Sequence, residues 1–419
     1  MILQGTSDDR AAAVTAQEIL TTTVMLKAQA LMNTRGVHDG EKRAKMRKTP
    51  IKATLVSISV LVWAVGTNLA TADSPSIGGY NVYYGQLHSH TNISDGLGSP
   101  SEAYAYARDS AGLDFFSVAD HDYWPDDMTQ ADWETLKTTA NCYNDDGTYV
   151  TFWGFEWTSD IPEPGYETLM GKGHFTVINS DDWCNAKEVP TNELDELVNW
   201  LDERDVVAVF NHPGQYDTTF DGFHFKYTDK IVGMELWNRS DDYYSNDGYY
   251  NDDGGLPYYD EAIVRGWYIG ATGSQDNHKK NWATENEWRM AVLAPERTRA
   301  SIYAAIQARR FYSSRDRNLA LSFRINGAEM GSKIGGGSLS IQIEASDGDN
   351  ENFSSVELLK NGIVIEAWTP GITNPNVRAT ATGSDGDYFY VRVYQSGENG
   401  WRAISSPIFI ISENNSAEQ

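Results

Sequence analysis

The segment Val82-Tyr83-Tyr84-Gly85-Gln86-Leu87-His88-Ser89-His90 joins a short apolar run to two histidines in alternate positions. The run up to Leu87 is typical of a buried β-strand. Because alternate residues of a strand share a face, both imidazoles can reach the same ion. The segment therefore predicts a strand that delivers metal ligands at its carboxyl end.

The same arrangement, an apolar run next to a ligand-type residue, recurs along the chain. The further members are Asp95 in Ser94-Asp95-Gly96, His121 in Asp120-His121-Asp122, Glu156 in Phe155-Glu156, His174 in Gly173-His174-Phe175, His212 in Asn211-His212-Pro213, and Asp276 and His278 in Gln275-Asp276-Asn277-His278. One such histidine is usually a core residue, but a whole series is hard to obtain by chance. Active sites of α/β barrels lie at the carboxyl ends of the strands, so the series predicts one barrel mouth.

Strand-like and helix-like segments alternate from Tyr80 to about Ser314. Strands are predicted at Val82–Leu87, Asp114–Ala119, Tyr149–Phe155, His174–Ile178, Val206–Asn211, Ile231–Trp237, Trp267–Thr272 and Arg289–Leu293. Helices are predicted at Pro100–Ala111 with Ser99 as N-cap, Thr191–Arg204, Asp260–Arg265 and Arg297–Arg310. Repeated units of this kind favour an α/β barrel or an open parallel sheet, with most strands buried and parallel.

After Arg317 the pattern changes to short strands without a long helix. The clearest turn is Asn361-Gly362 between two apolar runs, which indicates a type I′ hairpin. We expect an α/β barrel over residues 73–316, a small antiparallel β-sandwich over 317–412 and a disordered tail over 413–419.

The N-terminal region resembles an export signal. A basic stretch begins at Met46, an apolar run spans residues 53–70, and Ala70-Thr71-Ala72 is typical of a cleavage site. We expect residues 46–72 to be a signal peptide, translation to start at Met46, and residues 1–45 to be a misassigned start or disordered. The protein would then be periplasmic or extracellular, with no membrane contact after cleavage. An uncleaved membrane anchor is the alternative, since the run is near the minimum spanning length of ~18 residues.

The chain is strongly acidic, with a formal net charge of −26. Such a charge repels nucleic acids and anionic membranes, so neither is expected as a partner. The hydrolase hypotheses given below imply a small-molecule ester as the partner. Nothing in the sequence sets the oligomeric state. Cys142 and Cys184 could pair in an exported protein or remain free thiols, and neither sits in a metal-binding motif.

The ligand series mixes imidazoles and carboxylates, which suits Zn, Mn or Fe rather than Mg or Ca. Nine candidates, His88, His90, Asp95, His121, Glu156, His174, His212, Asp276 and His278, are too many for one ion. Two or three divalent ions can be held if Glu156 bridges a pair. Two ions about 3.5–4 Å apart can activate a bridging hydroxide for hydrolysis.

This succession of ligands resembles the PHP (polymerase and histidinol phosphatase) metallohydrolase superfamily, over roughly residues 80–315. The resemblance implies a distorted (β/α)7 TIM-like barrel with a trinuclear site. It places His88, His90, Glu156 and Asp276 on the first metal, Glu156, His174 and His212 on the second, and Asp95, His121 and His278 on the third. Glu156, Asp276 and His212 become the candidate catalytic residues. Asp95 stands where many members have a histidine, which leaves the metal preference open.

Packing motifs resemble the carbaryl hydrolase branch, which contains enzymes of carboxyl or carbamate esters. They are the helix Ile302–Tyr312 with its Arg309-Arg310-Phe311-Tyr312 end, Phe323-Arg324-Ile325-Asn326-Gly327, Tyr390-Val391-Arg392-Val393 and Ser405-Ser406-Pro407-Ile408.

Substrate-facing candidates are fewer. Arg239 follows a strand end and could bind an anion, although a surface salt bridge is an equal alternative. Trp157 is the second candidate; with Trp124, Trp237, Tyr243 and Tyr244 it would give an aromatic mouth, unless these rings only pack loops. The stretch Asp241–Asp260 is a solvated loop or a lid. His224 is expected to be a loop or packing residue, and His38 lies upstream of the signal.

Three functions compete. Hydrolysis of phosphoesters by a metal-bridging hydroxide ranks first, and hydrolysis of carboxyl or carbamate esters or amides ranks a close second. A secreted binding protein with a structural metal is the third, which the ligand count disfavours because structural sites use few ions.

Overall fold

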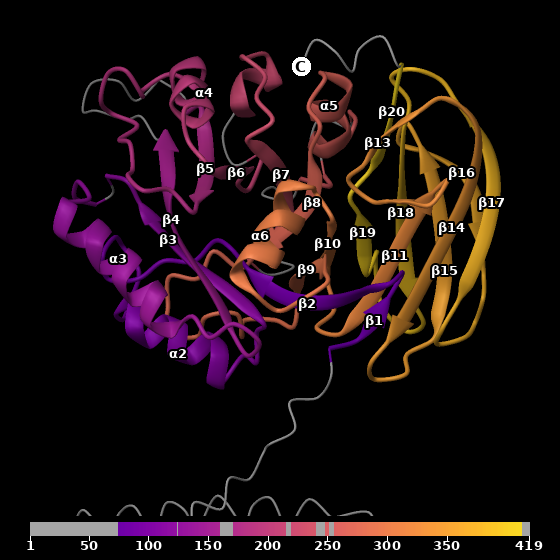
Figure 1. Ribbon diagram of the computed structural model, residues 1–419, viewed down its shortest axis with the longest axis horizontal. Helices are drawn as coiled ribbons and strands as arrows, with labels where there is room; N and C mark the ends of the chain where they lie inside the picture. Colours follow the sequence, from indigo (N-terminus) through magenta and orange to yellow (C-terminus); the bar gives the residue numbers. More distant parts are fainter. Residues whose placement is uncertain are drawn as a thin grey trace, which may run out of the picture. The chain divides into compact units, whose positions relative to one another are not determined.

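The first two thirds of the described chain mix strands and helices, whereas the last part contains only strands (Figure 1). This computed structural model describes residues 74–123, 125–159, 171–214, 219–239, 248–250 and 255–412. The expected upstream segment 1–45, signal peptide 46–72 and tail 413–419 lie outside the described residues. Within the described residues, no helix is both long and apolar enough to cross a membrane.

The mixed α/β part is built on one strand order. Its strands are β2 (Tyr80–Gln86), β3 (Phe115–His121), β4 (Val150–Ser159), β5 (Gly173–Ile178), β6 (Val207–Phe210), β7 (Ile231–Asn238), β8 (Gly270–Ser274) and β9 (Arg289–Ala294). They neighbour one another in the order β9-β2-β3-β4-β5-β6-β7-β8, and the short β1 (Ser76–Ile77) pairs with β2. All eight predicted strands are confirmed, with boundaries shifted by a few residues.

Strand direction departs from the expected parallel sheet. β5 runs antiparallel to both β4 and β6, and β9 runs antiparallel to β2. A parallel neighbour needs a crossover of roughly a dozen residues or more, usually helical. The sequence between β4 and β5 contains Pro162, Pro164 and Gly165, which oppose a helix. Because β5 is reversed, its first residues lie at the edge where β4 ends.

Helices cover this sheet. They are α2 (Pro100–Asp109), α3 (Gln130–Tyr143), α4 (Leu194–Asp202), α5 (Tyr258–Val264) and α6 (Arg299–Gln307), with a 3-10 turn η1 (Thr219–Phe223). α2 and α3 lie together against β3 and β4 (Figure 1). The Ser99 cap of α2 is confirmed, since its hydroxyl accepts from Glu102 N in a capping box. α3 was not predicted, although Trp133, Leu136 and Ala140 form its buried stripe.

The predicted helices Arg297–Arg310 and Ile302–Tyr312 are too long at their C-terminal ends. α6 stops at Gln307, and Arg309 has a left-handed backbone with φ 56°. Such a residue commonly ends a helix. The following residues form strand β10 (Phe311–Ser314), which pairs with β9.

The last part of the chain holds two sheets with a shared apolar core. Their strands are β11 (Leu319–Ile325), β12 (Ala328–Glu329), β13 (Lys333–Gly335), β14 (Gly337–Asp347), β15 (Phe353–Lys360), β16 (Ile363–Trp368), β17 (Asn376–Gly383), β18 (Tyr388–Gln395), β19 (Ala403–Ser405) and β20 (Ile408–Ile411). Four of them form the order β12-β11-β14-β17. The predicted hairpin is confirmed, since Asn361 and Gly362 have φ 53° and 78° and Lys360 pairs with Ile363.

The two parts of the chain are joined by a continuous sheet. β10 pairs with β9 on one side and with β19 on the other, and β19 pairs with β18. A buried carboxylate adds a second connection, because Asp260 of α5 accepts from Tyr388 Oη at 2.8 Å and Tyr390 Oη at 3.1 Å. Asp260 therefore lies in a packed helix, which confirms the predicted helix Asp260–Arg265 with shifted bounds. Most residues of the expected loop Asp241–Asp260 are not described.

The two cysteines do not pair. Cys142 is exposed on α3, whereas Cys184 is buried, and both are free thiols. The disulfide alternative is therefore wrong for this structure.

Candidate metal centre

His88 and His90 enter the site from the segment that follows β2. Their Nε2 atoms lie 3.1 Å apart, and both rings are buried. The main chain is tied to the segment after β8, since His90 N donates to Asn277 O at 2.9 Å. The first and last ligand segments of the sequence thus meet side by side.

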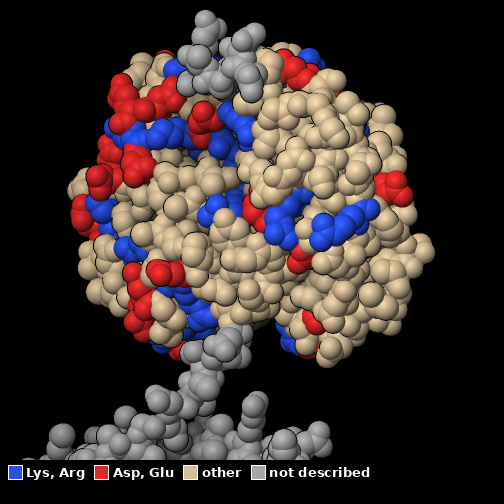
Figure 2. Space-filling model, turned by 45° about the vertical axis from the view of Figure 1, so that its right-hand side comes forward, with Lys and Arg blue, Asp and Glu red and all other residues tan. Residues whose placement is uncertain are grey.

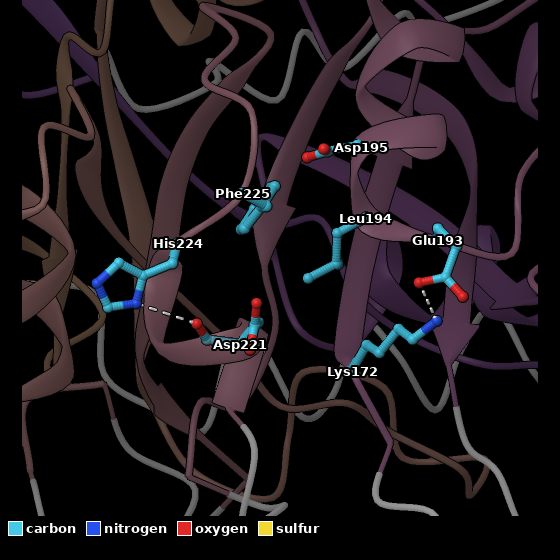
Figure 3. A pocket seen from close by; sticks show the side chains of 7 residues that line it. All are labelled: Lys172, Glu193, Leu194, Asp195, Asp221, His224 and Phe225. Atoms are coloured by element: carbon cyan, nitrogen blue, oxygen red, sulfur yellow. Dashed lines mark hydrogen bonds and ion pairs between the residues drawn. The ribbon is translucent and has the colours of Figure 1, made fainter.

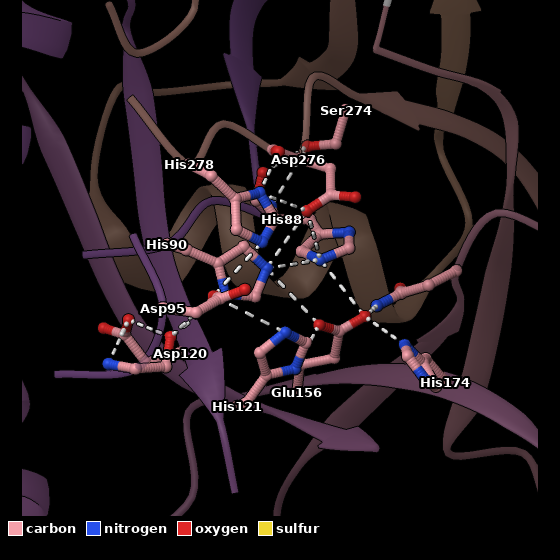
Figure 4. A network of polar contacts seen from close by, with 12 residues as sticks. His88, His90, Asp95, Asp120, His121, Glu156, His174, Ser274, Asp276 and His278 are labelled. Carbon is pink, nitrogen blue, oxygen red and sulfur yellow. Dashed lines mark hydrogen bonds and ion pairs between the residues drawn. The ribbon is translucent and has the colours of Figure 1, made fainter. Parts of the chain in front are cut away.

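Glu156 lies at the centre of the cluster (Figure 4). Five imidazole nitrogens surround its carboxylate: Nδ1 of His121 at 2.9 Å, Nε2 of His88 and Nδ1 of His174 at 3.2 Å, and Nε2 of His90 and of His212 at 3.3 Å. Both carboxylate oxygens are used, Oε2 toward His90 and His121 and Oε1 toward the other three. This two-sided contact is the geometry that a bridging ligand requires.

Reversal of β5 explains how His174 joins the cluster from the start of a strand. The other strand ligands lie within or just beyond the carboxyl ends of their strands, as His121 does in β3 and His212 after β6. An antiparallel strand brings its amino end to that same edge.

Asp95, His121 and His278 form a second part of the cluster. Oδ1 of Asp95 lies 3.2 Å from Nε2 of His278 and 3.7 Å from Nε2 of His121. Asp120 shapes the turn that carries Asp95, because its carboxylate accepts from Thr91 N and Thr91 Oγ1 at 2.7 Å. This buried aspartate supports a ligand without joining the ligand groups.

Asp276 faces two ways. Its Oδ1 lies 3.1 Å from Nε2 of His90 and 3.4 Å from Nε2 of His88, and it accepts no hydrogen bond from the described residues. Its Oδ2 accepts from Nε and Nη2 of Arg239 at 3.2 and 3.0 Å. One oxygen is thus left for an ion while the other is held by a cation.

Donor atoms gather in three groups, each with all its atoms within 4.8 Å of one another. The groups are His90, Asp95, His121 and His278; His88, His90 and Asp276; and His88, Glu156 and His212. Most members are buried, whereas Asp95 is exposed and His278 is half-buried. Imidazole nitrogens and carboxylate oxygens in this arrangement fit divalent ions. Compared with the expected sets, His88 takes the place of His174 beside Glu156 and His212, and His174 contacts Glu156 from outside that group.

Attraction between imidazoles and carboxylates shifts the pKa of His88, His90 and Glu156. Burial opposes charge on His88, but Glu156, Asp276 and Glu235 outweigh burial and hold its pKa well above the ordinary value. At His90, hydrogen bonds and charges of Asp276 and Glu156 likewise outweigh burial and raise the pKa to about 9. Burial is also outweighed at Glu156, whose neighbouring imidazoles hold its pKa well below the usual range. Ion binding must therefore displace protons from His88 and His90.

Glu235 was missed by the sequence reading. It lies in β7, is 2% exposed, and contacts Nδ1 of His88 at 3.0 Å through Oε1. The available signal was a lone carboxylate inside the apolar run Ile231–Trp237.

The aromatic mouth is not found among the described residues. Trp157 is fully buried, packs against Phe175 and donates from Nε1 to Thr191 O at 2.8 Å, so its expected substrate-facing position is wrong. Trp237 is also fully buried. Trp124, Tyr243, Tyr244 and His38 lie outside the described residues. His224 is exposed and contacts Asp221 O at 3.3 Å, away from the ligands, as expected.

One pocket opens onto the cluster. It has a volume of about 610 Å³ and is lined by Arg239, Asp276, His278, Lys279, Asn281, Thr284 and Glu285. A second pocket of about 570 Å³ contains none of the nine ligands (Figure 3); Lys172 and His224 lie on its wall. Arg239 therefore lies where a molecule approaching Asp276 and His278 would pass.

No protein-family model matches the chain. An uncharacterised protein of Chlamydia muridarum is 21% identical over 364 residues, with 79% of this chain and 57% of that protein covered. An uncharacterised protein of Chlamydia pneumoniae is 20% identical over 366 residues, with the same coverage. The chain thus spans little more than half the length of these relatives.

Among solved structures, a two-domain protein from Bacteroides vulgatus that contains a predicted PHP-like metal-dependent phosphoesterase is similar to this chain. The identity is 15%, the TM-score is 0.43, and the alignment covers 80% of this chain and 97% of the other. Fibronectin(III)-like modules of Clostridium thermocellum CbhA match 32% of the chain with a TM-score of 0.17.

Proposed function

We propose that this chain is a metal-dependent hydrolase of the PHP superfamily that acts on phosphoesters. The observation that carries the proposal is the ligand cluster itself, in which Glu156 contacts five imidazoles and connects the donor groups. The proposed architecture is a distorted (β/α)7 barrel followed by a β-sandwich. Packing of β8 against β10 supports closure of the sheet.

Divalent ions bound here would supply an activated hydroxide and charge stabilisation of the transition state. The chain would hold them through the three donor groups, of which two share His88 and two share His90. Arg239 neutralises the outer oxygen of Asp276 and lines the open pocket. A guanidinium there would orient an anionic substrate by charge-assisted hydrogen bonds.

The carboxyl or carbamate ester alternative loses part of its support. It rested on the packing motifs and on five aromatic side chains at the mouth. Of these, Trp157 and Trp237 belong to the core, whereas Trp124, Tyr243 and Tyr244 lie outside the described residues. A structural metal in a binding protein is also disfavoured, because structural sites are closed and this cluster opens into a pocket of about 610 Å³.

A substrate panel tests the proposal. Apo protein loaded with Mn²⁺ or Zn²⁺ is offered p-nitrophenyl phosphate, bis-p-nitrophenyl phosphate, aryl acetates and aryl carbamates. Turnover of the phosphates alone is expected; turnover of only the acetates or carbamates would reject phosphoester hydrolysis. His224→Ala is the matched control, because it removes an exposed histidine outside the cluster.

The proposal includes export and a small-molecule ester as substrate, with no nucleic-acid partner. Lys and Arg are interspersed with Asp and Glu on the face in Figure 2, which gives a polyanion no continuous basic surface there. Expression of the full chain in a bacterial host, followed by N-terminal sequencing of the exported protein, tests the leader. Cleavage after Ala72 would leave Asp73 as the first residue, whereas retention of residues 46–72 would contradict it.

A further inference from the structure

Glu235 is a buried carboxylate that contacts two of the ligand segments. It lies in β7 between the fully buried Met234 and Leu236. Its Oε1 is 3.0 Å from Nδ1 of His88, whereas its Oε2 accepts from His212 N and Asn238 Nδ2, each at 2.9 Å. An ionised carboxylate is costly to bury unless its hydrogen bonds are satisfied, and these three contacts satisfy it.

The chemistry of these partners fixes the role of each oxygen. A backbone N–H can only donate, so Oε2 must be an acceptor facing His212 N. Oε1 is then the acceptor for an Nδ1–H of His88. When an ion displaces the second proton, the proton that remains on Nδ1 leaves the Nε2 lone pair facing the other ligand atoms.

Nε2 of His88 faces the ligand atoms of three other residues. It lies 3.1 Å from Nε2 of His90, 3.2 Å from Oε1 of Glu156 and 3.4 Å from Oδ1 of Asp276. His88 belongs to two of the three donor groups. The ring orientation of this one histidine therefore affects two candidate ion positions.

Glu235 also acts on the main chain of a second ligand. His212 has a left-handed backbone with φ 25°, which is unfavourable for a non-glycine residue. The hydrogen bond from His212 N to Glu235 holds that conformation in place. Nε2 of His212 consequently points toward Glu156 at 3.3 Å.

We infer that Glu235 is a positioning residue of the metal centre, which fixes the side chain of His88 and the main chain of His212 without itself contacting the ions. This inference rests on the proposed metal-dependent function. Groups that support ligands in this way typically contribute 10–100-fold to metal affinity.

Glu235→Gln gives a specific test because of the fixed acceptor role of Oε2. The glutamine oxygen must face His212 N, so its NH₂ group faces Nδ1 of His88. That imidazole must then accept on Nδ1 and carry its proton on Nε2, where it opposes ion binding. Loss of affinity is therefore expected despite near-identical shape.

Binding of Mn²⁺ and Zn²⁺ alone to the apo protein is measured by calorimetry, and imidazole protons are observed by NMR after ¹⁵N-histidine labelling. We expect Glu235→Gln to weaken binding by about 10–100-fold and to abolish a downfield Nδ1–H resonance that His88→Ala also abolishes. Glu235→Asp, which keeps the charge but retracts it, carries the same test if the glutamine variant does not fold.

Asp260→Asn is the matched control. It neutralises another buried carboxylate, whose hydrogen bonds come from Tyr388 and Tyr390 and not from the candidate ligands. Its metal affinity and histidine spectrum should equal those of the wild type. Unchanged affinity and an unchanged Nδ1–H signal in the Glu235 variants would overturn the inference. Wild-type protein that binds ions yet hydrolyses no ester would instead reject the proposed function alone.

Discussion

The candidate metal centre and a cluster of three carboxylates both bring their oxygen or nitrogen atoms close together, but these atoms have different partners. Asp316, Asp347 and Glu351 bring three carboxylates as close together as the ligands of the metal centre. In that acidic cluster backbone groups already occupy the oxygens, since Asp347 Oδ1 accepts from Asp349 N and Glu351 N at 2.8 and 3.0 Å. In the metal centre imidazole nitrogens face one another instead. The candidate metal centre thus differs from the acidic cluster in combining carboxylates with imidazoles, so proximity of carboxylates alone does not mark an ion site.

Removal of a central ligand is the strongest way to break this comparison. His88→Ala removes a residue shared by two donor groups, and Glu156→Ala removes the carboxylate that contacts five imidazoles. In both variants metal content should fall and hydrolysis should drop by more than about 100-fold, beyond the effect of residues that only support ligands. Metal analysis and turnover of p-nitrophenyl phosphate measure this. Wild-type metal content in Glu156→Ala would show that the acidic cluster or another site holds the ions.

Removal of the metal ions tests whether ions bound at the candidate centre stabilise the folded state. A ligand at 100 times its Kd stabilises the folded state by about 2.7 kcal/mol per site. Chelation of the wild type should therefore lower the thermal midpoint and abolish turnover, and Mn²⁺ or Zn²⁺ should restore both. Full turnover after exhaustive chelation and dialysis would contradict a metal mechanism.

A buried carboxylate outside both clusters should make the stability of the protein depend on pH. Burial raises the pKa of Glu329 in β12 to about 7, although Arg324 opposes the shift. The folded protein then keeps a proton that the unfolded chain releases near pH 4.5, so the free energy of unfolding falls as pH rises from about 4.5 to 7, by up to about 3 kcal/mol. Glu329→Gln should remove this fall in denaturant titrations. An identical pH dependence in the variant would refute the assignment.

Asp347→Asn should have the smallest effect. It weakens hydrogen bonds within the acidic cluster, at a cost of about 1–2 kcal/mol in the free energy of unfolding. Metal content and turnover should equal those of the wild type. Loss of one equivalent of bound ion in this variant would mean that the acidic cluster is a further ion site.

The gathering of the candidate ligands was predictable because it depends on local chemistry. A polar residue next to a buried strand marks the sheet edge, and this rule brought together His88, Glu156 and Asp276 as candidates. The direction of β5 was not predictable in the same way, since it depends on which strands pair. Likewise, the place of His88 beside Glu156 and His212 follows from strand register rather than from sequence spacing.

The error at Trp157 was avoidable. Successive side chains of a strand point to opposite faces, so a Glu156 that enters the cluster sends Trp157 toward the covering layer. Glu235 was harder to find, because a single carboxylate in an apolar run has no partner at a characteristic spacing. Its role depends on His88 and His212, which are distant in sequence and meet only in the folded chain.

The contact between His90 N and Asn277 O has a consequence for biosynthesis. The first ligand, His88, precedes the last, His278, by about 190 residues. At ribosomal rates of 5–20 residues per second, roughly 10–40 s separate the synthesis of these two histidines. The emerging chain exposes incomplete sets of candidate ligands during that interval, so an ion that requires the complete set would bind only after the segment following β8 has been made.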